Sequence, residues 1–359
     1  MADLMTATCT YDSLVNKYGN FHVPAIRLYV DGSDAVQDLS LSIQSLEIFL
    51  SLSAASTAVI HLNNAYDQES RSFDSRIKNK FKLGTVVEVG IGYGSEIQKV
   101  LKGFVAVLGA EFGKNTCLVV TVADVRRLMM TGGVHHVLYD VSNYSDAVQT
   151  ILGEYSKLCT AEIDATDDQL DKPLSQRSTD YDFITKELIA MGRCEREFLV
   201  VGGKAYFRKP HGTAGAICSL ELGRELREFK IESAYTDLQV DVTGYNQQEQ
   251  SVVTASATAK SKEALSSVMT GTPVHHIIDP QLDTQEKAGI CAQAYADKQL
   301  SLAQNGSGVC VGLPELVPGR YVEVVMLEEM ANKKLYVQTV THRIGEEGFV
   351  TEFETGGWV

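Results

Sequence analysis

The stretch from Leu39 to Leu52, LSLSIQSLEIFLSL, decides the fold class of this 359-residue chain. Apolar residues alternate with mostly polar ones from Leu39 to Ile43, and the alternation resumes one residue out of phase from Leu46 to Leu52. A period of two is typical of a strand that buries one face. The slip at Gln44-Ser45 predicts a β-bulge, which bends a strand at the corner of a barrel.

Further strands are expected on both sides of this stretch. Residues 84–107 resemble a hairpin, because Val87, Val89 and Ile91 share one face and Gly90, Gly92 and Gly94 cluster around Tyr93. The other expected strands are 57–62, 117–122, 229–231, 237–242, 250–255, 321–327, 335–341 and 349–353. Many short strands with glycine turns predict a barrel or a sandwich in the first third and again in the last.

The middle of the chain has a different pattern. A helix is expected from Ser145, and a second helix should carry Ile184, Leu188 and Met191 on one face and stop at Gly192. Two short apolar runs joined by Gly202-Gly203 predict a hairpin. A further helix is expected near 284–303, with Asp283 and Glu286 at the spacing of a capping box.

These patterns predict a mainly β protein with an α+β insertion. Two similar β-barrel domains, at residues 1–125 and 211–359, should flank a small α/β domain at 126–210, and the helix near 284–303 should interrupt the second barrel.

Composition excludes several classes of protein. The net charge of −14 opposes non-specific binding of nucleic acid, and we also expect no direct, sequence-specific binding of nucleic acid. The sequence has no run of 18 apolar residues, so we predict no membrane span. The N-terminus has no secretory signal pattern. Seven scattered cysteines without a C-x-x-C pair fit a reducing compartment. We expect a cytoplasmic protein, or one that leaves the cell only within an assembled particle.

Motifs for chemistry are weak throughout the chain. The glycines at 90–94 lack the third glycine and the helix of a dinucleotide fingerprint. Adjacent residues on a strand point to opposite faces, so His135-His136 and His275-His276 could each offer only one ligand to a given metal site. Cys310 could pair with His275 or His342 in a thiol protease, but a cysteine in a strand is more typical of a packed core. Carboxylate pairs of glycosidase type stay open, because 46 acids allow many pairings. We predict no catalytic residue, no cofactor and no metal.

The order of the parts resembles the hub proteins of contractile tails, namely the phage late control gene D family and the N-terminal part of VgrG spikes. The similar segments are Lys82–Tyr93 with Leu101–Phe104, Thr179–Ile184 with Met191-Gly192, Ala292–Ala303 with Gly312–Gly319, and Val340–His342 with Gly348–Phe353. Together they span nearly the whole chain.

The resemblance implies a non-catalytic baseplate hub subunit of a contractile phage tail or phage-tail-like particle. It implies a homotrimer with a six-barrel ring that joins the tail tube protein to the spike protein, next to other baseplate proteins, in the bacterial cytoplasm during assembly and later in the virion. The chain ends at Val359 without a β-helix or a lysozyme-like segment, so the spike is expected to be a separate protein.

Aromatic residues near the C-terminus are candidates for a subunit or spike interface: Phe349, Phe353 and Trp358. The single tryptophan should either pack back on its own barrel or meet a neighbouring subunit. Two alternative functions stay open. One is a phage-associated peptidoglycan hydrolase or peptidase, and the other is a different tail structural protein, such as a tube, distal-tail or adhesin protein.

Overall fold

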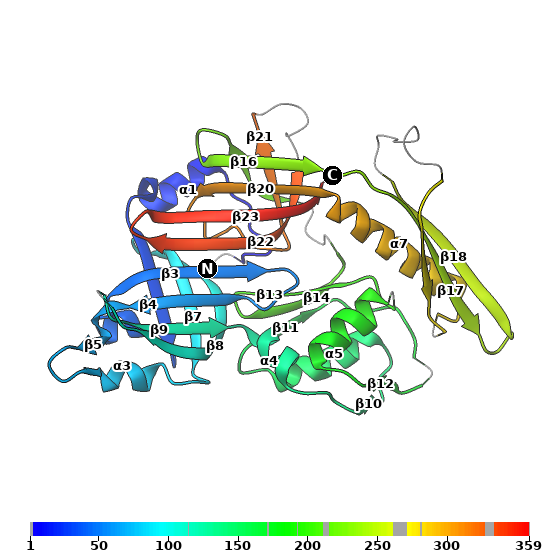
Figure 1. Ribbon diagram of the computed structural model, residues 1–359, viewed down its shortest axis with the longest axis horizontal. Coiled ribbons are helices and arrows are strands. Elements are labelled where there is room, and N and C mark those ends of the chain that lie inside the picture. The colour runs from blue at the N-terminus through cyan, green and yellow to red at the C-terminus, as the bar shows by residue number, and fades with distance from the viewer. Residues whose placement is uncertain are drawn as a thin grey trace.

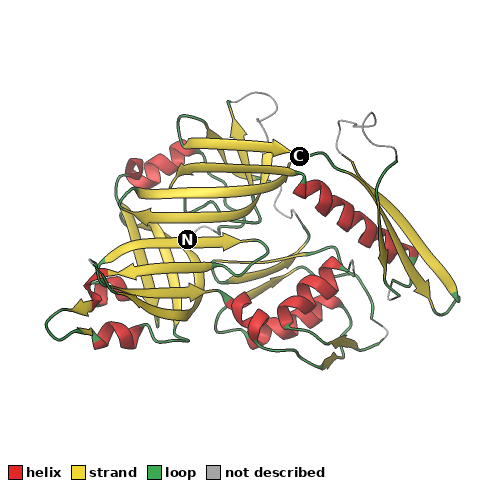
Figure 2. Ribbon diagram, viewed as in Figure 1, coloured by secondary structure: helices red, strands yellow, loops and turns green. Residues whose placement is uncertain are grey.

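A computed structural model describes residues 3–113, 115–170, 172–191, 193–210, 215–260, 271–280, 282–326 and 334–358. Most of the strands form one large sheet, with a small α/β unit beside it and a separate strand-and-helix arm that extends from one side (Figures 1 and 2). Among the described residues, no helix has the length and apolar character needed to cross a membrane.

The first part of the chain supplies seven neighbouring strands of the large sheet, in the order β3-β4-β9-β8-β7-β1-β2. Their bounds are β1 Pro24–Val30, β2 Ser33–Asp34, β3 Ile43–Ser51, β4 Thr57–Leu62, β7 Val86–Tyr93, β8 Glu96–Glu111 and β9 Cys117–Ala123. The register of β3 against β4 shifts between Ile43 and Ser45, which confirms the predicted bulge. The expected start of this strand at Leu39 is wrong, because helix α2 (Ala35–Asp38) ends there.

The last part of the chain supplies the other strands of the same sheet, in the order β16-β20-β23-β22, with β21 beside β22 and β15 beside β21. Their bounds are β15 Ala216–Glu221, β16 Leu226–Ser233, β20 Gln304–Val311, β21 Tyr321–Val325, β22 Lys334–Gly345 and β23 Gly348–Trp358. β22 pairs antiparallel with β3, from Thr339 opposite Ser51 to Ile344 opposite Leu46.

The β22–β3 pair, which we call the seam, therefore joins the two ends of the chain into one thirteen-stranded sheet. Within the described residues this sheet does not close into a barrel, so the mainly β prediction is confirmed, while two separate barrels remain an interpretation.

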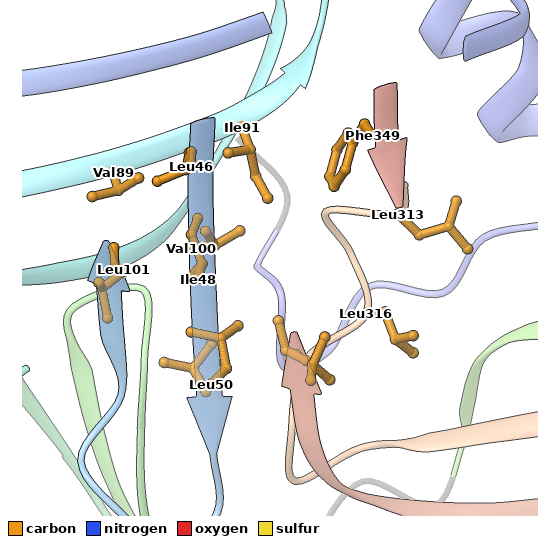
Figure 3. Packing of buried hydrophobic residues seen from close by; sticks show 14 of the residues in the cluster. Leu46, Ile48, Leu50, Val89, Ile91, Val100, Leu101, Leu313, Leu316 and Phe349 are labelled. Atoms are coloured by element: carbon orange, nitrogen blue, oxygen red, sulfur yellow. The ribbon is translucent and has the colours of Figure 1, made fainter. Parts of the chain in front are cut away.

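One hydrophobic core lies under both halves of the sheet. Leu46 of β3 lies beside Val89 and Ile91 of β7, Ile48 lies beside Val100, and Leu50 lies farther along β3 (Figure 3). The loop after β20 brings Leu313 and Leu316 to the same core. Burial of alternate residues in each strand follows from the period of two that the sequence shows.

The middle unit, residues 125–208, has its own core. Its elements are α4 Val125–Thr131, β10 Val137–Tyr139, α5 Tyr144–Glu154, β11 Thr160–Ile163, β12 Leu174–Gln176, α6 Asp180–Asp182, the π-helix η3 Phe183–Ala190, β13 Glu197–Val201 and β14 Lys204–Arg208. The Gly-Gly hairpin is confirmed, with φ of 59° at Gly202 and 84° at Gly203, values that favour glycine. Met191 is 42% exposed, so it does not continue the apolar face predicted for the second helix.

The arm consists of a three-stranded sheet and one long helix. Its elements are β17 Asp237–Asn246, β18 Ser251–Lys260, β19 Val274–Ile278 and α7 Gln285–Leu302. The strand order is β18-β17-β19, and α7 packs Ala288 and Ala292 against Val240 and Val242 of β17. The helix is confirmed, but its N-cap is Thr284, whose hydroxyl accepts from the Lys287 N–H, and not the expected Asp283.

The short elements cover the edges and ends of the large sheet. They are α1 Tyr11–Tyr18, η1 Gly19–Phe21, η2 Asn63–Ala65, β5 Tyr66–Asp67, β6 Ser72–Phe73 and α3 Ser75–Lys80. The N-terminal segment is anchored to the C-terminal half, because the buried Arg320 donates to the carbonyl oxygens of Leu4 and Ala7. Tyr18 of α1 likewise donates to the Glu315 carboxylate at 2.5 Å.

Candidate assembly surface

The solvent side of strands β3, β22, β23, β20 and β16, which we call the seam face, presents side chains in rows that cross from one half of the chain to the other. One row follows directly from the strand registers: Phe49, Thr341, Glu352, Val309 and Glu228. The next row contains Thr339, Glu354, Ser307 and Lys230, while Ser51, opposite Thr339 on β3, is buried.

Acidic residues exceed basic ones on the seam face. The carboxylates of Glu47, Glu228, Glu232, Glu352 and Glu354 share it with the cations Lys230 and Arg343. Arg343 donates from Nε to Glu47 at 2.8 Å and from Nη1 to Glu352, so it bridges three strands. Hydrogen bonding to Glu47, followed by Glu352, raises the pKa of Arg343. The face therefore keeps a negative balance.

Three hollows lie on the seam face, and the smallest, of about 310 Å³, lies around Lys230 and Glu354. The second, of about 430 Å³, is lined by Phe49 and Phe229 together with Glu228 and Glu352. The third, of about 450 Å³, lies at the end of β22 and β23, where Glu346 and Glu347 join the residues around Arg343. The two larger hollows combine aromatic or aliphatic surface with carboxylates, and both lie on strands that the seam brings together.

The predicted interface residues Phe349 and Phe353 lie inside the core, with exposed fractions of 5% and 2%. Phe349 stacks on Tyr93 with ring centroids 5.4 Å apart, and the ring of Phe353 lies over Gly308, where a Cβ would come within 2.4 Å of it. The expectation that these two rings face a partner is corrected, because their strand turns them inward. The side chain of Trp358 lies outside the described part of the structure.

A buried ion pair fastens the middle unit to the sheet. Arg126 of α4 and Asp124 are both fully buried, and Arg126 Nη2 donates to Asp124 Oδ2 at 2.7 Å. Arg126 also donates to the carbonyl oxygen of Ser51 at 2.9 Å and to the Ser56 hydroxyl at 2.8 Å, at the end of the seam strand β3. Sequence reasoning missed this pair. Its only signal was Asp124 before a helix, where it acts as the N-cap.

A second polar network connects the Gly-Gly hairpin with the C-terminal strands. Glu197 of β13 accepts from Arg208 Nε at 2.7 Å and from the Tyr336 hydroxyl at 2.7 Å. Arg208 also donates to the Gly319 carbonyl oxygen at 2.5 Å. Burial, and then the charge of Glu197, raise the pKa of Tyr336, so its hydroxyl stays protonated and donates. The middle unit is thus held by two sets of buried charges.

The residues weighed for thiol chemistry are unsuited to it in this structure. Burial raises the pKa of Cys310, and burial lowers the pKa of His342 to about 3. A thiol nucleophile needs a thiolate, and a base needs a pKa near the working pH, so both shifts run in the wrong direction. His342 Nδ1 instead forms a 2.9 Å hydrogen bond with Thr351 Oγ1.

The histidine pairs lie apart in the middle unit and in the arm. His135 Nε2 is 4.0 Å from an Asp180 oxygen, His276 Nδ1 is 4.0 Å from an Asp241 oxygen, and His275 stacks on Tyr295. Among the described residues, no group of three or more His, Cys, Asp or Glu side chains gathers as metal ligands would.

Solved structures of similar fold are tail and secretion-system proteins. The tail protein from Neisseria meningitidis MC58 is 12% identical, with 94% of this chain and 97% of that chain covered and a TM-score of 0.68. The 43 kDa tail protein of prophage MuSo2 from Shewanella oneidensis is 12% identical, with 92% and 97% covered and a TM-score of 0.66. An E. coli type VI secretion component, described as similar to the T4 tail proteins gp27 and gp5, is 12% identical, with 92% and 76% covered and a TM-score of 0.54.

These likenesses show a shared fold across nearly the whole chain. No curated protein matches the sequence. The model of the family described as the Alg8 N-terminal domain matches residues 22–346, which span both halves of the large sheet, the middle unit and the arm. The chain belongs to the family of the Alg8 N-terminal domain.

Proposed function

We propose that the chain is a structural hub subunit of a contractile tail or phage-tail-like particle, where it connects the tail tube to the central spike. The observation that carries the proposal is the fold shared with the Neisseria tail protein over 94% of this chain and 97% of that one. A domain grafted on another protein would match in part only, whereas here the two molecules correspond almost from end to end.

The proposed assembly is a homotrimer of the late control gene D type. In it, residues 1–125 and 211–359 act as two tube-like barrel domains and residues 126–210 as the small domain between them. The seam supports this arrangement, because it holds the two halves at a fixed relation through six consecutive residue pairs. Three copies would then offer six similar units to a hexameric tube, in a closed ring.

The seam face is proposed to line the passage of this ring. Its acidic balance would keep anionic or acidic cargo from adhering, since like charges repel across a narrow, poorly screened channel. The partners are the tube protein, the spike protein and other baseplate proteins, with neither membrane nor nucleic acid as a direct target. The tail of β23 around Trp358 stays a proposed interface with a subunit or the spike.

The proposed role needs no catalysis and no cofactor. Two buried charge networks and one shared core stiffen the molecule, and stiffness is what a connector must supply. The protein would be made in the bacterial cytoplasm and end in the baseplate of the particle.

Labelling within assembled particles tests this role. Particles that carry a C-terminally tagged chain would be imaged by electron microscopy with a tag-specific antibody fragment. We expect a label confined to the end of the tube where the spike attaches. A label distributed along the tube would support a tube protein and would overturn the hub.

A further inference from the structure

A cavity of about 550 Å³ lies where the middle unit meets the start of α7 in the arm. The loop around β12 supplies Lys172 and Arg177, the turn after η3 supplies Arg193, and α7 supplies Lys287. Tyr144 at the start of α5 lies in its wall. Four cations from three separate parts of the fold therefore border one cavity.

The sign of its charge is opposite to that of the chain. The net charge of the chain is −14, and the hollows of the seam face are bordered mainly by carboxylates. Among the described residues that line this cavity, Glu187 is the one acid, and its carboxylate accepts a 2.5 Å hydrogen bond from Ser178. A cationic cavity on an acidic protein attracts anions to one place, because the field elsewhere repels them.

The cations differ in whether they already form an ion pair with an acidic side chain. Lys287 pairs with Asp283 at 2.8 Å, while Lys172 and Arg177 are exposed and have no recorded ion pair among the described residues. The pKa of Tyr144 reflects the charges around it. Burial raises this pKa, the positive charges of Arg193 and Lys287 act against the rise, and the Asp168 carboxylate, which accepts from the Tyr144 N–H, adds to it. The cavity thus offers cations that can pair with an incoming anion.

We propose that this cavity binds a short acidic segment of a partner polypeptide, with two or three carboxylates reaching Lys172, Arg177 and Lys287. Its volume is that of a site for a ligand of modest size, so it takes a few residues rather than a folded domain. A nucleic acid fits less well, since it needs a continuous basic surface and this chain is acidic beyond the cavity. The site lies within one chain, so it does not depend on the hub role.

The test uses the full chain and a fluorescein-labelled octaglutamate peptide as the probe, followed by fluorescence anisotropy. We expect saturable binding that weakens as salt rises. The double variant Lys172→Gln/Arg177→Gln should bind roughly tenfold more weakly, since each lost pair removes a few-fold in affinity. The control Lys78→Gln/Lys82→Gln removes two exposed charges in and just after α3, which lies away from β12 and α7 (Figure 1), and should bind as the wild type does.

Three outcomes would overturn the proposal. They are absence of peptide binding by the wild type, equal binding by the two double variants, and displacement of the peptide by inorganic tripolyphosphate at far lower concentration than by unlabelled peptide. The last result would assign the cavity to a small phosphate ligand. Unchanged melting temperatures of both variants would show that the difference in binding does not arise from unfolding.

Discussion

Arg343 donates a 2.8 Å hydrogen bond to Glu47 across the seam, although 296 residues separate them in the sequence. The pair marks the place where the two ends of the chain become one sheet. Both side chains are about half exposed, so solvent screens their attraction. The seam must therefore be held by its backbone ladder and by the buried residues beneath it.

Substitutions on the two sides of the seam test whether the buried residues, rather than the exposed ion pair, hold it together. Arg343→Gln should lower the free energy of unfolding by at most about 1 kcal/mol, as exposed ion pairs do. Leu50→Ala, on the buried side of the same strands, should lower it by about 2–5 kcal/mol, because it leaves a cavity in the shared core. Urea unfolding at pH 7 measures both. A larger loss for the arginine variant would mean that the ion pair holds the seam.

Substitution of the buried Arg126 should lower the free energy of unfolding far more than substitution of Arg343. Arg126→Met leaves the Asp124 carboxylate buried without its cation and should cost about 3–5 kcal/mol. The neighbouring Arg127→Met is the matched control, because Arg127 is exposed, and it should stay within about 0.5 kcal/mol of the wild type. Thermal and urea unfolding of the two variants gives the comparison. Similar values would show that Arg126 does not anchor the unit.

Glycine at position 308 should be required by the ring of Phe353. Gly308→Ala would bring a Cβ within 2.4 Å of that ring, and the resulting overpacking should cost about 1–3 kcal/mol. Gly289→Ala on α7 meets no atom within 4 Å, so it should leave stability unchanged or raise it by up to about 1 kcal/mol. Equal melting temperatures of the two variants would contradict the inward placement of Phe353.

The pH dependence of stability should carry the signature of His342. Burial lowers its pKa from 6.5 to about 3, so below pH 6.5 the unfolded chain binds a proton that the folded chain does not. Stability should therefore fall as the pH drops from 6.5 toward 3, by up to about 1.4 kcal/mol per pH unit from this group.

His342→Gln isolates that contribution. Glutamine retains a polar group near Thr351 and cannot be protonated, so the loss of stability between pH 7 and 5 should become shallower than in the wild type. Most carboxylates titrate below this window. Parallel pH profiles for the two proteins would contradict the neutral, buried state of His342.

The sequence predicted the local elements well wherever burial alternates along a strand. The bulge at Gln44-Ser45, the strands around Val87–Ile91 and the Gly202-Gly203 hairpin all follow from side-chain period and turn chemistry. The start of β3 was misplaced because Leu39 and Leu41 also alternate with serines, although they follow a short helix.

The seam and the buried charges could not be predicted from the sequence. Pairing of β3 with β22 depends on contacts about 290 residues apart, and no local pattern records them. Arginine is usually a surface residue, yet Arg126 and Arg320 are buried, and their guanidinium groups donate tertiary hydrogen bonds. The sequence makes Phe349 and Phe353 interface candidates because aromatic residues serve both cores and interfaces, and only the fold distinguishes the two uses.

The mass of the purified chain in solution, measured by light scattering after size exclusion, tests the hub most directly. The account predicts either a trimer of about 118 kDa, three times the 39.2 kDa of one chain, for the protein alone, or a heavier complex that holds three copies of the chain and three of the spike protein. A stable 39.2 kDa monomer that does not associate with the spike protein would contradict the hub assignment.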